Sequence, residues 1–134
     1  FANSPVAAVH ALAYPIGGTF HISHGLSNSL VLPYVLRFNS VDVKAAKNYA
    51  ELAPYVFPKL DINKGTQAVC AEFIDKLEDL SKRLGLPQKL REVDIPKDAC
   101  EKMASDAMKQ TRLLVNNPRE VTEVDALNIY QSAW

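Results

Sequence analysis

Apolar residues recur at intervals of three and four along most of the chain, which is the spacing of amphipathic helices. The clearest predicted helix spans about residues 66–84, and Gly85 and Pro87 follow it as a C-terminal cap and a stop. Its apolar stripe consists of Val69, Phe73, Leu77, Leu80 and Leu84. We expect Phe73, Leu77 and Leu80 to pack in a hydrophobic core. The same holds for Met103 and Met108 of a later helix.

Further helices are predicted on both sides of this one. Pro5 suits the first turn of a helix that runs to Tyr14, where Pro15 and the Gly17-Gly18 pair end it. The others cover about residues 24–38 with a kink or restart at Pro33, 41–57, 96–114, and a short last helix that opens with a capping box from Thr122 to Asp125. No segment alternates with the period of a strand. The pattern therefore predicts an all-α domain of roughly six helices.

Composition narrows the class of protein. A chain of 134 residues with 48% hydrophobic content suffices for one domain around a single core. Its 15 basic and 15 acidic side chains balance, so we expect no nucleic acid or anionic membrane surface as a partner. The longest apolar run, residues 30–36, is far shorter than the roughly 20 residues that a membrane span requires. These features predict a soluble protein.

The two cysteines and the first residues bear on location. Cys70 and Cys100 lie in helical patterns without metal-binding spacing, which favours reduced thiols in the cytosol, with a disulfide as the alternative. Residue 1 is Phe, and the first ten positions lack the pattern of a signal peptide. We therefore expect a cytoplasmic protein and a chain that begins inside a longer one.

All three histidines, His10, His21 and His24, fall within fifteen positions. Neutral imidazoles on separate rigid elements are typical metal ligands, and His10 and His24 would converge across the Gly-Gly loop. Two ligands are too few for a catalytic metal, so the others would come from elsewhere. The alternative is structural: His10 bonded to a carbonyl in the core and His24 capping a helix. His21 is a weaker candidate, with a solvent-facing or substrate-facing role more in keeping with its loop.

Longer motifs point to a family. Residues 9–18 read Val-His-Ala-Leu-Ala-Tyr-Pro-Ile-Gly-Gly, and His-Gly-Leu-Ser-Asn at 24–28 and Leu-Pro at 32–33 follow. This set closely resembles the second signature of iron-containing alcohol dehydrogenases. Leu-Gly-Leu-Pro at 84–87, Asn-Pro-Arg at 117–119 and the residues near the end, including Thr122, Asp125 and Tyr130, extend the resemblance over essentially the whole chain. Phosphate-binding and hydrolase motifs, in contrast, are absent.

The resemblance implies an architecture and a reaction. In that family an N-terminal α/β domain binds NAD or NADP, a helical C-terminal domain closes over it, and the metal lies between them. Residues 1–134 would be the helical domain, in which the family's two C-terminal metal ligands fall on His10 and His24. The upstream aspartate and histidine ligands are not in this sequence. The implied reaction is reversible oxidation of a small alcohol to an aldehyde or ketone, with Fe(II) expected and Zn(II) also suited to such ligands. Homo-oligomerisation is left open.

Two positions depart from the family pattern. Tyr14 stands where many members have a second histidine, one helical turn after His10 and on the substrate side. A phenol donates a hydrogen bond readily but is a poor proton acceptor at neutral pH, so we treat Tyr14 as a candidate that contacts substrate. Asp94 stands where relatives often have glycine. We expect Tyr14 to face the open cleft on the same side of its helix as His10.

Two alternatives remain open on the sequence. One is a related enzyme such as a maleylacetate reductase, a glycerol dehydrogenase or a dehydroquinate-synthase-like protein, although Ala-Tyr-Pro-Ile-Gly-Gly favours the alcohol dehydrogenase branch. The other is a free-standing helical interaction module with structural histidines. The chain offers no nucleotide-binding motif and half of a metal site, so we expect the chain alone to lack activity and to bind metal poorly.

Overall fold

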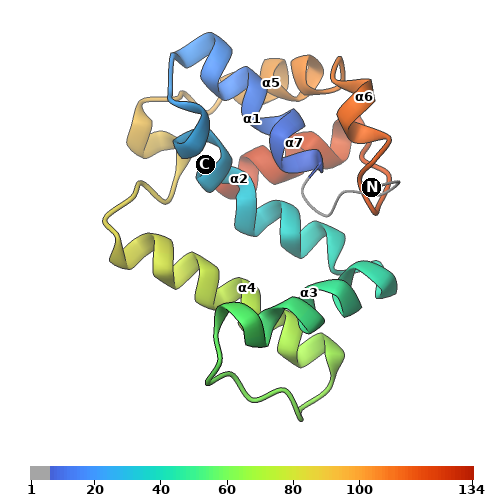
Figure 1. The fold of residues 1–134 in the computed structure, drawn as a ribbon. Coiled ribbons are helices and arrows are strands. Elements are labelled where there is room, and N and C mark those ends of the chain that lie inside the picture. The colour runs from blue at the N-terminus through green and yellow to red at the C-terminus, as the bar shows by residue number, and fades with distance from the viewer. Residues whose placement is uncertain (1–6) are drawn as a thin grey trace.

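A computed structural model describes residues 7–134, and every regular element within that range is a helix (Figure 1). The prediction of an all-α fold is confirmed. Pro5, expected in the first turn of the first helix, lies outside the described residues. The elements are α1 (Ala7–Phe20), α2 (His24–Asn39), α3 (Val43–Val56), α4 (Thr66–Arg83), a short 3₁₀ helix η1 (Leu90–Val93), α5 (Ala99–Ala107), α6 (Thr111–Leu114) and α7 (Glu123–Ala133).

Some predicted helix boundaries are wrong. Helix α1 does not end at Tyr14 but continues through Pro15 and the glycine pair to Phe20. Burial explains the difference: the Pro15 ring and Ile16 are both buried, so packing outweighs the missing backbone donor and the flexibility of glycine. Helix α2 likewise runs through Pro33 without a restart.

The helix expected over residues 96–114 is two helices. Helix α5 begins at Ala99, and after Ala107 the N–H of Gln110 donates to the carbonyl of Ala107 at 3.0 Å, which closes a tight turn. Gln110 then leaves helical geometry, with φ −85° and ψ 51°, before α6 starts. The capping box that opens α7 is confirmed, because Thr122 and Asp125 each accept the backbone N–H of the other.

The helices pack around two apolar clusters, with α2 between them (Figure 1). The first cluster joins α1, α5 and α7 with Leu30, Val31 and Val35 of α2, and it includes Met103. The second joins α3 and α4 with the end of α2, and it includes Phe73. Leu32 of α2 packs against both clusters and so connects them. The expected core positions of Met103 and Phe73 are therefore confirmed, while Met108 and Leu77 are partly buried.

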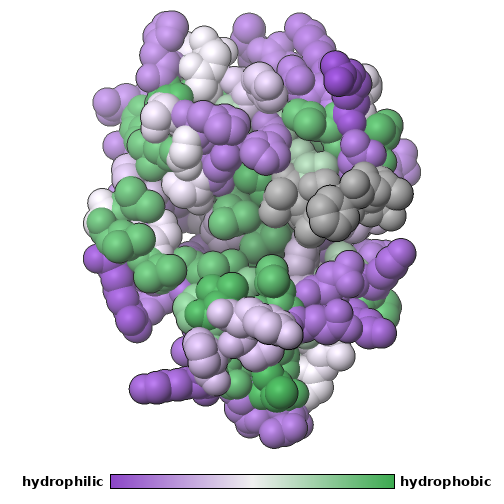
Figure 2. All heavy atoms as spheres, viewed as in Figure 1, coloured by the Kyte–Doolittle hydropathy of each residue, from purple (hydrophilic) through white to green (hydrophobic). Residues whose placement is uncertain are grey.

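Leu80 is a wrong core prediction. It is 42% exposed, and Leu84 and Leu86 beyond it are also exposed, so apolar surface lies over this end of α4 (Figure 2). The reason is the length of the helix: all buried residues of α4 fall between Val69 and Ile74, in its first half. The apolar period of the sequence therefore continues beyond Ile74, the last fully buried residue of the helix.

Both cysteines are free thiols in different clusters, Cys70 in the second and Cys100 in the first. Burial raises the pKa of each thiol, which disfavours the reactive thiolate. Among the described helices, none combines the length and apolar character needed to cross a bilayer.

Candidate metal centre

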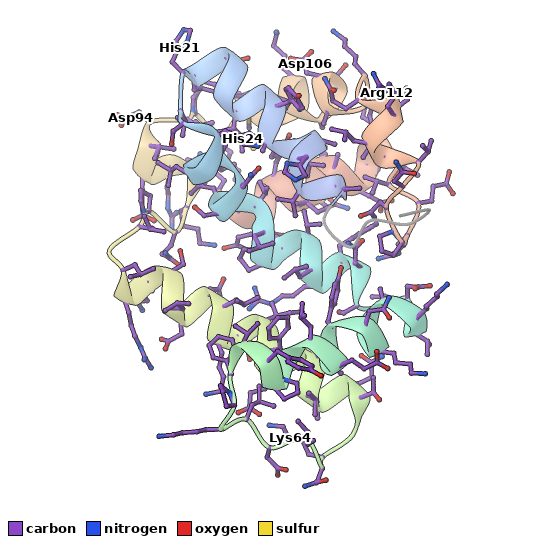
Figure 3. All side chains as sticks on the ribbon, viewed as in Figure 1. His21, His24, Lys64, Asp94, Asp106 and Arg112 are labelled. Atoms are coloured by element: carbon purple, nitrogen blue, oxygen red, sulfur yellow. The ribbon has the colours of Figure 1, made fainter. Side chains whose placement is uncertain are left out.

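The fold brings His10 and His24 together. His10 is half-buried in the first turns of α1, and His24 is the exposed first residue of α2 (Figure 3). Their imidazole rings are nearly parallel, with an interplanar angle of 14° and ring centroids 5.5 Å apart. Two residues from different helices thus face each other, as the sequence analysis expected.

The loop between α1 and α2 holds this arrangement. His21 directly follows α1 and lies in the left-handed region, with φ 56°, and its N–H donates to the Gly17 carbonyl at 3.0 Å. The Ser27 hydroxyl of α2 lies 2.8 Å from the carbonyl of Ser23 and 3.3 Å from that of Ile22. Gly17 permits the close packing, because a Cβ there would lie 3.2 Å from the Ile22 carbonyl oxygen. The loop is therefore fastened to both helices immediately before His24.

The structural alternative for the histidines gains no support. Ser23, and not His24, caps α2, and its side chain accepts the Leu26 N–H at 3.4 Å. Among residues 7–134 the imidazole of neither His10 nor His24 makes a hydrogen bond to a carbonyl or to any other group. Their ring nitrogens are therefore available to a ligand.

The distance between the two rings is compatible with a shared divalent ion. Two imidazoles bound to one metal at about 2.1 Å have ring centroids about 5 Å apart, close to the 5.5 Å spacing here. The rings are stacked, and a metal lies in the plane of each imidazole that it binds, so at least one ring must turn before both can hold the same ion. One turn after His24, the side-chain oxygen of Asn28 is buried without a hydrogen-bond partner among the described residues.

The described residues do not complete a metal site. Among them, no group of three or more His, Cys, Asp and Glu side chains is arranged to hold an ion. His21 lies at the outer end of α1, and it makes no ring contact with His10 or His24 in the described structure (Figure 3). An ion held by His10 and His24 would therefore need further ligands from outside the described residues.

Tyr14 follows His10 by one helical turn and is 55% exposed. It is not packed in the core, so its phenol is accessible to a molecule that approaches α1. A hollow of about 360 Å³ lies elsewhere, between α2 and α7, and is lined by residues that include Tyr34, Arg119 and Asn128 but neither histidine.

Comparisons with known proteins agree over the full length of the chain. Residues 1–134 match the family described as "Fe-containing alcohol dehydrogenase family, C-terminal". The chain is 38% identical over 137 residues to long-chain-alcohol dehydrogenase 1 of Geobacillus thermodenitrificans, covering 100% of this chain and 33% of that protein. It is 30% identical over 134 residues to lactaldehyde reductase of Escherichia coli, again covering all of this chain but 34% of the relative.

Solved structures give the same result. The fold is similar to that of 1,3-propanediol oxidoreductase, with a TM-score of 0.86 and 28% identity, over 95% of this chain and 32% of that one. An alcohol dehydrogenase from Oenococcus oeni gives a TM-score of 0.84 at 28% identity, over 94% of this chain and 32% of that one. The chain thus spans about a third of the length of the relatives that it matches.

Proposed function

Because the chain belongs to the iron-containing alcohol dehydrogenase family, we propose that it is the C-terminal, metal-binding part of a cytoplasmic oxidoreductase that interconverts an alcohol and an aldehyde or ketone. The observation that carries the proposal is the His10–His24 pair, two facing imidazoles with free ring nitrogens. NAD or NADP would be bound mainly by an N-terminal α/β domain of the same protein. That domain would also supply the aspartate and histidine that complete the metal site.

Each residue of the site has a role that follows from its position. His10 and His24 would hold Fe(II) or Zn(II), because imidazole nitrogens suit both ions. When bound, such an ion acts as a Lewis acid that lowers the pKa of an alcohol and polarises a carbonyl. Tyr14, exposed one turn after His10, would contact the substrate and donate a hydrogen bond to its oxygen. Because a phenol is a poor proton acceptor at neutral pH, Tyr14 would not serve as the proton acceptor.

The substrate of the whole enzyme is proposed only as a class, a small-molecule alcohol or aldehyde. The relatives' names include a long-chain-alcohol dehydrogenase, a lactaldehyde reductase and a 1,3-propanediol dehydrogenase, which all share this chemistry. The alternative of a helical interaction module predicts histidines with structural hydrogen bonds. Neither His10 nor His24 makes one within residues 7–134, which favours the enzyme.

The test is metal content and turnover in the polypeptide that joins this chain to the nucleotide-binding domain. We expect His10→Ala and His24→Ala each to lose bound metal and alcohol-dependent reduction of NAD⁺ or NADP⁺. His21→Asn is the matched control for metal content, since it removes a nearby imidazole but keeps a residue that tolerates positive φ. It should retain the metal.

Two results would contradict the proposal. One is full metal content in both His10→Ala and His24→Ala. The other is metal-dependent turnover by the 134-residue chain alone, which would show that the cofactor site lies within it. We expect the chain alone to be inactive, because hydride transfer requires a nicotinamide held beside the alcohol.

A further inference from the structure

Helix α1 is capped by a residue far away in the sequence. The side-chain oxygen of Asn117 accepts the backbone N–H of Ala8 at 3.3 Å, across 109 positions. Ala8 is the second residue of α1, and the N–H groups of a first helical turn have no partner inside the helix. Asn117, which is only 6% exposed, therefore does for α1 what an N-cap side chain does in other helices.

The same amide is locked in orientation by a second buried amide. Asn117 Nδ2 donates to Asn39 Oδ1 at 2.8 Å and to the Arg119 carbonyl at 2.7 Å, and Asn39 Nδ2 donates back to Asn117 Oδ1 at 3.1 Å. Asn39 is fully buried at the end of α2. Since both donors and the acceptor of Asn117 have partners, its oxygen cannot turn away from Ala8 without leaving buried groups unpaired.

Arg119, two residues after Asn117, binds the end of helix α2. Its guanidinium donates to the Phe38 carbonyl in the last turn of α2 at 2.9 Å, and it lies 3.9 Å from the centroid of the Phe38 ring. The loop of residues 117–119 thus joins the start of α1 to the end of α2. These two helices carry His10 and His24.

We propose that Asn117 is a positioning residue for the metal centre, which acts by holding the first turn of α1 and thereby His10. The proposal rests on the function proposed above. His10 lies two residues after Ala8, so fraying of an uncapped first turn reaches its backbone. His24 follows its own cap, Ser23, and does not depend on Asn117 in this way. Loss of Asn117 should therefore weaken metal binding through His10.

The experiment measures Co(II) affinity, by competition with a chelator, in the complete polypeptide with its nucleotide-binding domain. Asn117→Ala removes the acceptor for the Ala8 N–H, and we expect it to weaken Co(II) binding about 10- to 100-fold. Asn117→Asp loses the two Nδ2 donors and so lowers stability, but it keeps an acceptor oxygen beside Ala8, where the helix N-terminus favours negative charge. It should retain Co(II) affinity within about threefold. The Co(II) absorption bands of Asn117→Ala should also change, as expected when one ligand becomes disordered.

Asn39→Ala is the matched control. It breaks the same buried amide pair and lowers stability, but it leaves Asn117 beside Ala8, so its Co(II) affinity should stay near that of the parent. Should Asn117→Ala not fold, Asn117→Ser takes its place, because the shorter serine hydroxyl reaches less far toward Ala8.

The outcomes separate the two proposals. If Asn117→Ala, or Asn117→Ser in its place, loses no more Co(II) affinity than Asn39→Ala or Asn117→Asp, then Asn117 is structural only and the positioning role is overturned. If the parent protein binds Co(II) no better than His10→Ala, the metal-binding function itself fails. Both proposals are supported if Asn117→Ala, or Asn117→Ser in its place, loses Co(II) affinity while the two other variants keep it, and if Co(II) binding by the parent protein requires His10.

Discussion

A methyl group added at Gly17 tests how closely α1 must approach the loop that leads to His24. A Cβ at Gly17 would lie 3.2 Å from the Ile22 carbonyl oxygen and 3.7 Å from Ser27 Oγ, whereas a Cβ at Gly18 would meet nothing within 4 Å. The Ile22 oxygen belongs to the backbone and lies 3.3 Å from the Ser27 hydroxyl. It can therefore move away only if the chain just before His24 moves with it.

A comparison of the two neighbouring glycines isolates the free-energy cost of the close contact at Gly17. Within a helix, replacing glycine by alanine raises the free energy of unfolding by up to about 1 kcal/mol, and this gain applies to both positions. At Gly17 the close contact opposes it, and overpacking typically costs about 1–3 kcal/mol. We therefore expect Gly18→Ala to stabilise the chain and Gly17→Ala to be about 1–3 kcal/mol less stable than Gly18→Ala.

The assay is urea unfolding followed by far-UV circular dichroism, with thermal melting as a second measure. For a domain of this size, 1 kcal/mol corresponds to about 4 °C in Tm. If the proposed function is correct, Gly17→Ala should also weaken metal binding in the complete polypeptide, because His24 follows the displaced loop, while Gly18→Ala should not. Equal stability and equal metal affinity of the two variants would refute the packing argument.

Two further predictions concern stability. Asp94 has φ 64°, so Asp94→Gly should raise the free energy of unfolding by up to about 1 kcal/mol. Asp94→Ala should lower it, and urea unfolding that gives both changes the same sign would contradict this backbone explanation. Burial raises the pKa of Tyr49 to about 12 and that of Tyr130 well above its usual value, so both tyrosines keep their protons longer in the folded state. Their contribution to stability is complete below about pH 10, where an unfolded tyrosine is still protonated, and is lost as the pH rises toward 12. In Tyr130→Phe the unfolding free energy should fall less steeply above about pH 10, by up to about 1.4 kcal/mol per pH unit. An unchanged pH profile of the unfolding free energy would argue against this role of Tyr130.

Local patterns in the sequence were sufficient for the fold class and for most helices. The apolar period predicted α4, and Thr122 and Asp125 form the capping box that the sequence indicated, because both signals act between residues within one or two helical turns. The positions of the three histidines favoured His10 and His24 over His21, and the family resemblance then assigned these two as metal ligands. Spacing alone left the structural alternative open, since it does not say which helix faces which.

Tertiary packing decided the remaining features. Burial of Pro15 and Ile16 carries α1 through residues that usually end a helix. Leu80 is exposed despite its regular spacing, because it lies beyond Ile74, the last buried residue of α4. The bond from Ala8 to Asn117 joins positions 109 residues apart, so no local pattern could predict it. The sequence determines which groups need partners, but a partner that is distant along the chain is chosen only when the helices pack and exclude water.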